Sequence, residues 1–119
     1  MRLLICDNNR LLSLLLSKKL AVEGYDITVV GDGLSALKII NNGNIDFLIT
    51  EIQVPYLSGL ELLSNIKKKD NRIPVIILSE INSENIISQA YNMGADDYIT
   101  KPFNPDVLPF RIKRVLLTL

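Results

Sequence analysis

The sequence contains no histidine and only one cysteine, Cys6. Without histidine, the chain lacks the side chain that most often serves as a general base or as a metal ligand. A single cysteine excludes a disulfide bond within the chain. Because Cys6 lies in an apolar stretch, we expect it to be a buried thiol in a reducing compartment.

Net charge and long apolar runs are also missing. Lys plus Arg and Asp plus Glu number 13 each, so the formal net charge is zero. Nucleic-acid binding depends on clustered cations, so we expect no direct nucleic-acid contact by this domain. No apolar stretch is long enough to span a bilayer, and the opening residues MRLLICDNN lack the apolar region of a signal peptide. We therefore expect no membrane contact and a cytoplasmic location.

The composition is that of a globular domain. Of the 119 residues, 48% are hydrophobic and 22% are charged, which is enough to build one buried core over residues 1–119. Apolar and β-branched runs predict strands at Arg2–Cys6, Asp26–Val30, Phe47–Thr50, Val75–Leu78 and Tyr98–Thr100. Helical spacing of apolar residues predicts helices at Arg10–Glu23, Leu34–Asn42 and Gly59–Lys69. A fourth helix is predicted from a cap at Asn82 or Ser83 to Gly94, and a fifth from about Asp106. A polar connection is predicted at Asp70–Pro74.

Strands that alternate with helices in this way predict a parallel sheet covered on both faces. The expected fold is a doubly wound α/β sandwich of three layers, with five strands in the order 2-1-3-4-5 and a ligand crevice between strands one and three. Asp7 and Glu51 each follow a strand, and Lys101 follows the last one. Because the carboxyl ends of parallel strands meet at one edge, we expect an acidic pocket that faces a lysine.

Several segments resemble the receiver domains of two-component response regulators. They are LLICDNN, EGYDITVVGDGLSALKII, DFLITEIQVPYLSGLELL, PVIILS and GADDYITKPF, which together span the chain without gaps in register. The resemblance implies the flavodoxin-like fold of that family. GADDYITKPF is especially similar to receivers of winged-helix regulators, which implies that the chain is the amino-terminal part of a longer transcriptional regulator.

The resemblance also implies roles for individual residues. Asp7 matches an acid that binds Mg²⁺, and Ser79 and Lys101 match the residues that contact the phosphoryl group. Lys101-Pro102 matches a cis peptide bond, and Tyr98 matches the aromatic switch residue of the last strand. Glu51 stands at the position of the phospho-acceptor aspartate.

Two positions depart from the family pattern. Asn8 replaces the second acid, so the expected Mg²⁺ site loses one negatively charged ligand. Glu51 moves the acceptor carboxylate outward by about 1.5 Å, and a misplaced nucleophile can cost on the order of 100-fold in rate. We expect Mg²⁺ to bind weakly or not at all. Taken alone, Asn8 is also typical of a helix N-cap.

The departures leave two functions open, neither of them enzymatic. In the first, the domain is an atypical receiver that is not phosphorylated in the ordinary way. Glu51 then pairs with Lys101 in place of a phosphoryl group, Ser79 moves toward the acid and Tyr98 turns inward. In the second, Glu51 accepts a phosphoryl group from a histidine kinase. A flavin-binding protein of the same topology is disfavoured because no phosphate-binding loop follows the first strand.

Two surfaces are candidates for partner binding. Receivers of the winged-helix class dimerise through charge pairs on the fourth helix, fifth strand and fifth helix, and this resemblance implies a homodimer that uses Asp96, Asp97 and Arg111. Ile87, Val107 and Thr118 stand where further charges are expected. The first helix also carries Leu11, Leu14 and Val22 outside its main apolar stripe. They are either scattered exposed residues or a docking face.

Overall fold

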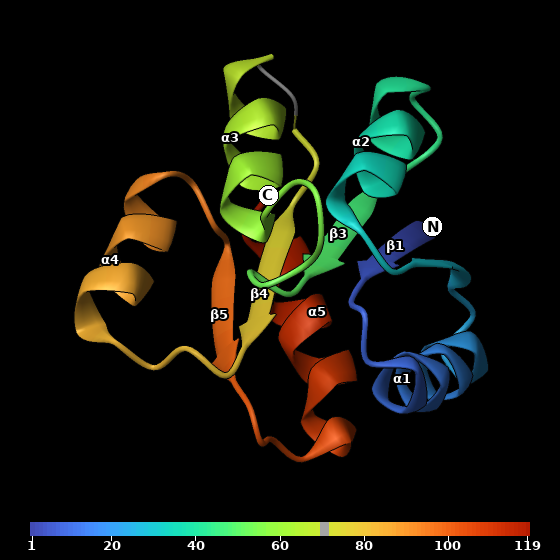
Figure 1. Cartoon of the computed structure of the whole chain (residues 1–119). Coiled ribbons are helices and arrows are strands. Elements are labelled where there is room, and N and C mark those ends of the chain that lie inside the picture. Colours follow the sequence, from blue (N-terminus) through green and yellow to red (C-terminus); the bar gives the residue numbers. More distant parts are fainter. Residues whose placement is uncertain (70–71) are drawn as a thin grey trace.

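The computed structural model describes residues 1–69 and 72–119 and confirms the predicted fold. Within these residues the strands form one five-stranded parallel sheet in the order β2-β1-β3-β4-β5 (Figure 1). The elements follow the order β1 (Arg2–Cys6), α1 (Arg10–Val22), β2 (Asp26–Val30), α2 (Gly33–Asn41), β3 (Phe47–Thr50), α3 (Gly59–Lys68), β4 (Val75–Ser79), α4 (Glu84–Asn92), β5 (Asp97–Thr100), the 3₁₀ turn η1 (Pro105–Val107) and α5 (Leu108–Leu117).

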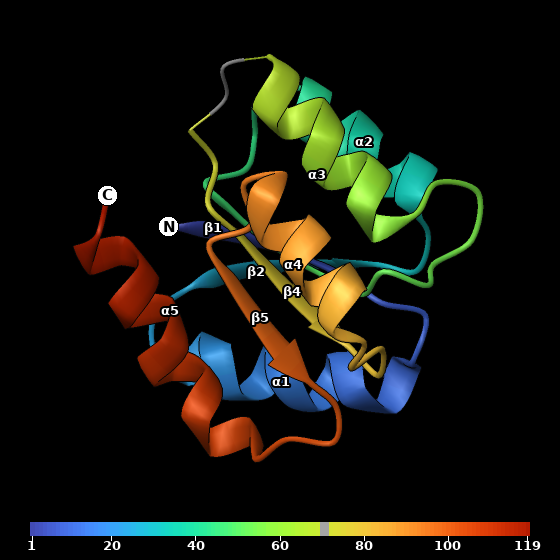
Figure 2. The same cartoon turned by 90° about the vertical axis from the view of Figure 1, so that its left-hand side faces the viewer.

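The helices cover both faces of the sheet. Figure 2 shows α1 and α5 together below the strands and α2, α3 and α4 above them. Alternate residues of the strands supply the two cores: Leu3 and Ile5 of β1 face α1 and α5, whereas Leu4 and Cys6 face the other three helices. The central strands β3 and β4 are buried along their whole length, as expected for parallel strands covered on both sides.

The ends of the helices explain why they begin where they do. Asn9, Asp32, Ser58 and Ser83 cap α1 to α4 through side-chain oxygens that accept backbone N–H groups. Ser83 is thus the cap that was predicted as one of two candidates for α4. The interpretation of Asn8 as the cap of α1 is wrong, because the side chain of Asn9 accepts the hydrogen bond from Leu12 N at 3.1 Å.

The last helix was expected to start at about Asp106, but α5 begins at Leu108. Pro105–Val107 form a 3₁₀ turn, and Pro109 lies in the first turn of α5, where its missing N–H costs no helical hydrogen bond. The first two residues of the connection predicted at Asp70–Pro74 lie outside the described residues. Among the residues that the structure describes, no helix is both long and apolar enough to cross a membrane.

Candidate functional site

The carboxyl edge of the sheet gathers the predicted site residues. Asp7 follows β1, Glu51 follows β3, Ser79 ends β4 and Lys101 follows β5. Because β1 and β3 are neighbours, Asp7 and Glu51 leave the sheet side by side. The two acids, Asp7 and Glu51, and Ser79 are almost fully buried.

Lys101 joins the two acids. Its Nζ lies 2.8 Å from Asp7 Oδ2 and 3.2 Å from Glu51 Oε1, and the three side chains are 12%, 3% and 7% exposed. Burial alone lowers the pKa of the Lys101 ammonium. The hydrogen bond and charge of Asp7, together with the charge of Glu51, outweigh that effect and hold the pKa above its ordinary value. The ammonium therefore stays charged between the two carboxylates. The peptide bond from Lys101 to Pro102 is cis.

The second oxygen of Glu51 is turned back onto its own chain. Oε2 accepts the backbone N–H of Ile52 at 2.6 Å and that of Gln53 at 3.3 Å. This tight turn is possible because Gly59 lies against it: a Cβ on Gly59 would come within 2.2 Å of the Glu51 carbonyl oxygen. Both carboxylate oxygens of Glu51 therefore have partners inside the protein.

Asp7 is also satisfied on both sides. Its Oδ1 accepts the backbone N–H of Asn9 at 2.9 Å, and its Oδ2 accepts from Lys101. Asn8 is exposed, and no hydrogen bond of its side chain occurs within the part of the chain that the structure describes. In that same part, no group of three or more His, Cys, Asp or Glu side chains is arranged to hold a metal ion. Asp7 and Glu51 are the carboxylates at this edge that could hold Mg²⁺, an ion that proteins usually bind through one or two carboxylates and several waters.

The predicted switch residues meet at the loop after β4. Ser79 is fully buried and its Oγ accepts the backbone N–H of Ile81 at 3.2 Å. Tyr98 is 7% exposed, and its hydroxyl donates to the carbonyl oxygen of Ile81 at 2.6 Å. Burial raises the pKa of Tyr98, so the hydroxyl remains a donor at neutral pH. Tyr98 thus points inward. The Ser79 oxygen bonds Ile81, and among the described residues no hydrogen bond joins it to Glu51, the acid toward which the atypical-receiver hypothesis expects it to move.

The residues predicted for the dimer face are bonded within the chain. Asp97 is 2% exposed, and its carboxylate receives Arg111 Nε at 2.7 Å and the second guanidinium nitrogen of Arg111 at 2.8 Å. Burial raises the pKa of Asp97, but these bonds and charges hold it below its ordinary value. Asp96 lies elsewhere: it accepts the Val75 N–H at 2.8 Å and faces Lys67 at 3.6 Å.

Sequence reasoning missed two members of this cluster. Arg114 reaches Asp97 at 3.3 Å, and the hydroxyl of Tyr91 donates to it at 3.4 Å. The spacing of Arg111 and Arg114, three residues apart on one helix, places both on the same side of α5 and was a usable signal. Tyr91 comes from α4, and nothing in the local sequence indicates its contact.

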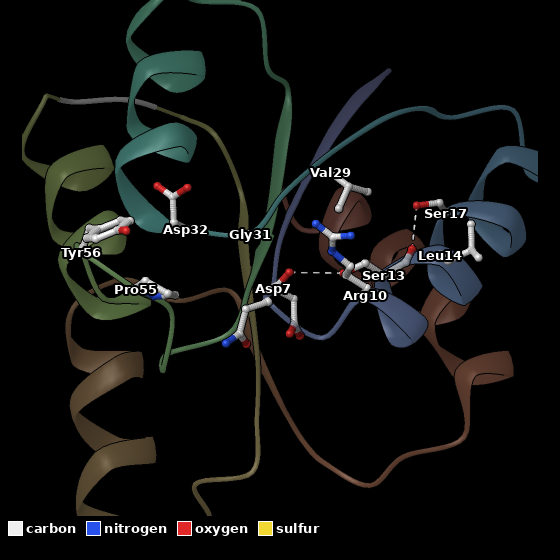
Figure 3. A pocket seen from close by; sticks show the side chains of 11 residues that line it. Asp7, Arg10, Ser13, Leu14, Ser17, Val29, Gly31, Asp32, Pro55 and Tyr56 are labelled. Carbon is white, nitrogen blue, oxygen red and sulfur yellow. Dashed lines mark hydrogen bonds between the residues drawn. The ribbon is translucent and has the colours of Figure 1, made fainter.

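A pocket of about 600 Å³ opens beside Asp7 (Figure 3). It lies between the start of α1, the end of β2 and the loop that follows β3. Arg10, Leu14, Val29 and Tyr56 are among its lining residues. Tyr56 is 82% exposed and has a φ of 71°, a backbone conformation that residues other than glycine seldom adopt. The pocket provides solvent access to the edge where Asp7 lies.

The sheet order and the acid–lysine cluster at its carboxyl edge define a doubly wound α/β domain with a receiver-type pocket. The family model described as the response regulator receiver domain matches residues 3–113, and the chain belongs to this family. It is a signalling module of two-component systems. The structure brings the side chains of Lys101, Glu51 and Asp7 into contact at the carboxyl edge of the sheet.

Several proteins are similar to this chain. RprY of Bacteroides fragilis and TctD of Salmonella typhimurium, both described as transcriptional regulatory proteins, are 31% and 32% identical over 98% of this chain. The matches cover 49% and 52% of those proteins, so the chain spans about half the length of these relatives. The receiver domain of the Francisella response regulator 1452 has a TM-score of 0.91 and 34% identity, with 98% of this chain and 97% of that chain covered. A receiver domain protein from Methanospirillum hungatei has the same TM-score, 29% identity, and coverage of 98% and 94%.

Proposed function

We propose that this receiver is a regulatory protein-interaction module whose state is set by Glu51 instead of by phosphorylation of an aspartate. The observation that carries the proposal is the bond between Glu51 Oε1 and Lys101 Nζ at 3.2 Å. Lys101 is the residue that contacts the phosphoryl group in the family pattern. The permanent carboxylate provides one negative charge and two oxygens where a phosphoryl group provides nearly two charges and three oxygens.

The geometry of Glu51 argues against ordinary phosphorylation. A nucleophilic oxygen has to be free to approach phosphorus in line, and phosphoryl transfer depends mainly on positioning and charge neutralisation. One Glu51 oxygen bonds Lys101 and the other bonds two backbone N–H groups. Asn8 contributes no charge, so Mg²⁺ binding is expected to be weak.

The inward position of Tyr98 supports an activated state. Its hydroxyl and the Ser79 oxygen together bond both backbone groups of Ile81, which fixes the loop between β4 and α4. We infer that this arrangement favours the partner-bound form of the surface formed by α4, β5 and α5, as a population shift that needs no phosphoryl donor. In this proposal the Glu51 charge acts through Lys101, whose side chain it bonds and whose backbone N–H donates to the Ser79 carbonyl oxygen at 2.8 Å.

The biological setting follows from the relatives. The matched proteins are transcriptional regulators about twice as long as this chain. We therefore infer that the domain controls transcription in the cytoplasm through a DNA-binding segment of a longer protein and does not itself bind DNA. Its partners in this account are a second copy of the chain and a signalling protein such as a histidine kinase.

The proposal is tested by Glu51→Gln, which keeps the shape of the side chain and removes its charge. Backbone amide signals of Ile81 and Tyr98 are followed by nuclear magnetic resonance in the natural chain and the variant. We expect both signals to shift and to report a second conformation of the loop. Glu23→Gln, on the far end of α1, is the matched control and is expected to leave them unchanged. Identical loop signals in the natural chain and Glu51→Gln would refute the proposed role of Glu51.

A further inference from the structure

The loop between β3 and α3 holds Tyr56 in a strained turn. The backbone N–H of Leu57 donates to the carbonyl oxygen of Pro55 at 2.8 Å, which closes a three-residue γ-turn around Tyr56. A γ-turn whose central φ is positive, here 71°, is rare and strained. The Tyr56 side chain is mostly exposed, so no burial of the ring compensates for the strain. Strained residues of this kind persist where their surroundings fix them, and they cluster at ligand-binding sites.

The start of α2 fixes this turn. The backbone N–H of Gly33 donates to the same Pro55 oxygen at 3.0 Å. A Cβ atom on Gly33 would lie 1.8 Å from the carbonyl oxygen of Leu57, so the close approach requires glycine at this position. The contact holds the turn in the folded domain and keeps Tyr56 at the pocket of about 600 Å³.

The pocket carries opposite charges on its two sides. Figure 3 shows Tyr56 and Asp32 on one side and Arg10 on the other. Within the part of the chain that the structure describes, the Arg10 guanidinium has no hydrogen bond or ion pair. Each carboxylate oxygen of Asp32 accepts one hydrogen bond from Ser35, at 2.8 and 2.7 Å, which leaves both oxygens able to accept a further donor. The same bonds lower the pKa of Asp32, so its carboxylate is charged at neutral pH.

Asp7 and the two serines that line the pocket are already paired. Asp7 bonds Lys101 at 2.8 Å, which compensates its charge. The hydroxyl of Ser13 donates to the Asp7 carbonyl oxygen at 3.4 Å, and the hydroxyl of Ser17 donates to the Ser13 carbonyl oxygen at 2.7 Å. The charged groups that remain for a ligand are therefore one cation and one anion, on opposite sides of the pocket.

We propose that this pocket binds a small zwitterion, a molecule with one carboxylate and one ammonium group on a short apolar stem. The carboxylate bonds the Arg10 guanidinium, whose planar fork matches it. The ammonium lies beside Asp32 and against the ring of Tyr56, which attracts a cation through its face. The stem lies along Leu14 and Val29, which also line the pocket. The pocket volume is within the range of small-molecule sites, about 300 to 1,000 Å³.

The two charges select a zwitterion over a ligand with one charge. An anion bound to Arg10 would leave Asp32 without a cation and would be repelled by it, and a cation bound to Asp32 would be repelled by Arg10. A molecule with both groups satisfies both sides at once. Glu51 does not line the pocket, so the inference does not rest on the proposed role of Glu51.

Titration of the natural chain, followed by nuclear magnetic resonance, tests the inference. The probes are γ-aminobutyrate and ε-aminocaproate. Hexylamine and hexanoate are the matched controls, because each carries one of the two charges on the six-carbon stem of ε-aminocaproate. We expect at least one zwitterion to shift the backbone amide signals of Gly33, Tyr56 and Leu57 with a millimolar dissociation constant. Each single-charge probe should bind at least roughly tenfold more weakly.

Variants of the two charged side chains locate the ligand. Arg10→Gln and Asp32→Asn each remove one charge, and asparagine keeps the N-cap of α2. Both should weaken zwitterion binding by roughly tenfold. Lys68→Gln, which removes an exposed cation at the end of α3 outside the pocket, is the control and should leave the affinity unchanged. None of the three side chains is buried, so circular dichroism should show an unchanged fold.

Three results would overturn the inference. The first is unchanged amide signals with both zwitterions up to the tens-of-millimolar range. The second is binding of hexylamine or hexanoate that is as tight as that of the zwitterions. The third is an affinity that Arg10→Gln leaves unchanged, since the ligand would then lie elsewhere.

Discussion

Removing the Lys101 ammonium from its buried cluster with Asp7 and Glu51 is the substitution for which we expect the largest loss in the free energy of unfolding. Lys101→Met keeps the length and apolar stem of the side chain and deletes its charge. Asp7 and Glu51 then remain side by side at 3% and 7% exposure without a cation between them. Their hydrogen bonds to the backbone N–H groups of Asn9, Ile52 and Gln53 persist but carry no full positive charge.

The magnitude follows from the two distances. At an effective dielectric constant of about 20, unit charges at 2.8 and 3.2 Å attract by about 6 and 5 kcal/mol. Desolvation of the ammonium offsets much of that attraction. What dominates in the variant is the uncompensated buried charge, which typically costs about 3 to 5 kcal/mol. This is a large share of the stability of a domain of this size.

Urea unfolding at neutral pH, followed by circular dichroism, measures the loss. Lys113→Met is the matched control, because its pair with Glu23 spans 3.9 Å between side chains that are 58% and 38% exposed. That pair should contribute less than about 1 kcal/mol. The difference between the natural chain and Lys101→Met should shrink at high pH. The raised pKa of Lys101 means that its contribution is complete below its ordinary value of 10.5 and is lost as the pH rises through the higher folded value. Equal losses for Lys101→Met and Lys113→Met at neutral pH would refute the reasoning.

Three further predictions concern single contacts and use the same unfolding assay. Asn9→Ala should cost about 1 kcal/mol as the loss of a cap, whereas Asn8→Ala should cost almost nothing; the reverse order would contradict the assigned cap. Arg111→Met should cost about 3 kcal/mol at neutral pH, and because the pKa of Asp97 is lowered, this loss should fade as the pH drops below 3.8. A loss that is the same at all pH values would exclude the Asp97 pair as its cause. Tyr98→Phe should cost about 1 kcal/mol for the bond to Ile81, and no loss would show that the bond contributes nothing.

The sequence predicted the fold and the gathering of charges because both depend on periodic signals. Apolar runs located every strand, and the sheet topology then required Asp7, Glu51 and Lys101 to meet at one edge. The boundaries shifted by a residue or two: β4 extends to Ser79, β5 begins at Asp97, and α5 begins at Leu108 after a 3₁₀ turn. These shifts depend on turn geometry, to which periodicity is blind.

The missing details depend on contacts between distant segments. The position of Asn9 as the cap is set by how the chain leaves β1, and the two residues Asn8 and Asn9 are equally good caps by composition. The backbone partners of Glu51 depend on a turn that Gly59 permits from a distance in the sequence. Tyr91 reaches Asp97 only because α4 flanks β5. No local pattern carries that information.

The central claim, that Glu51 occupies the acceptor position without accepting a phosphoryl group, is tested most directly by intact-mass measurement. The natural chain is incubated with acetyl phosphate and Mg²⁺ and compared with the variant that combines Asn8→Asp and Glu51→Asp. The variant restores the acids of the family pattern and is expected to gain one phosphoryl group, whereas the natural chain is expected to keep its mass. A phosphoryl adduct on Glu51 of the natural chain would contradict the account.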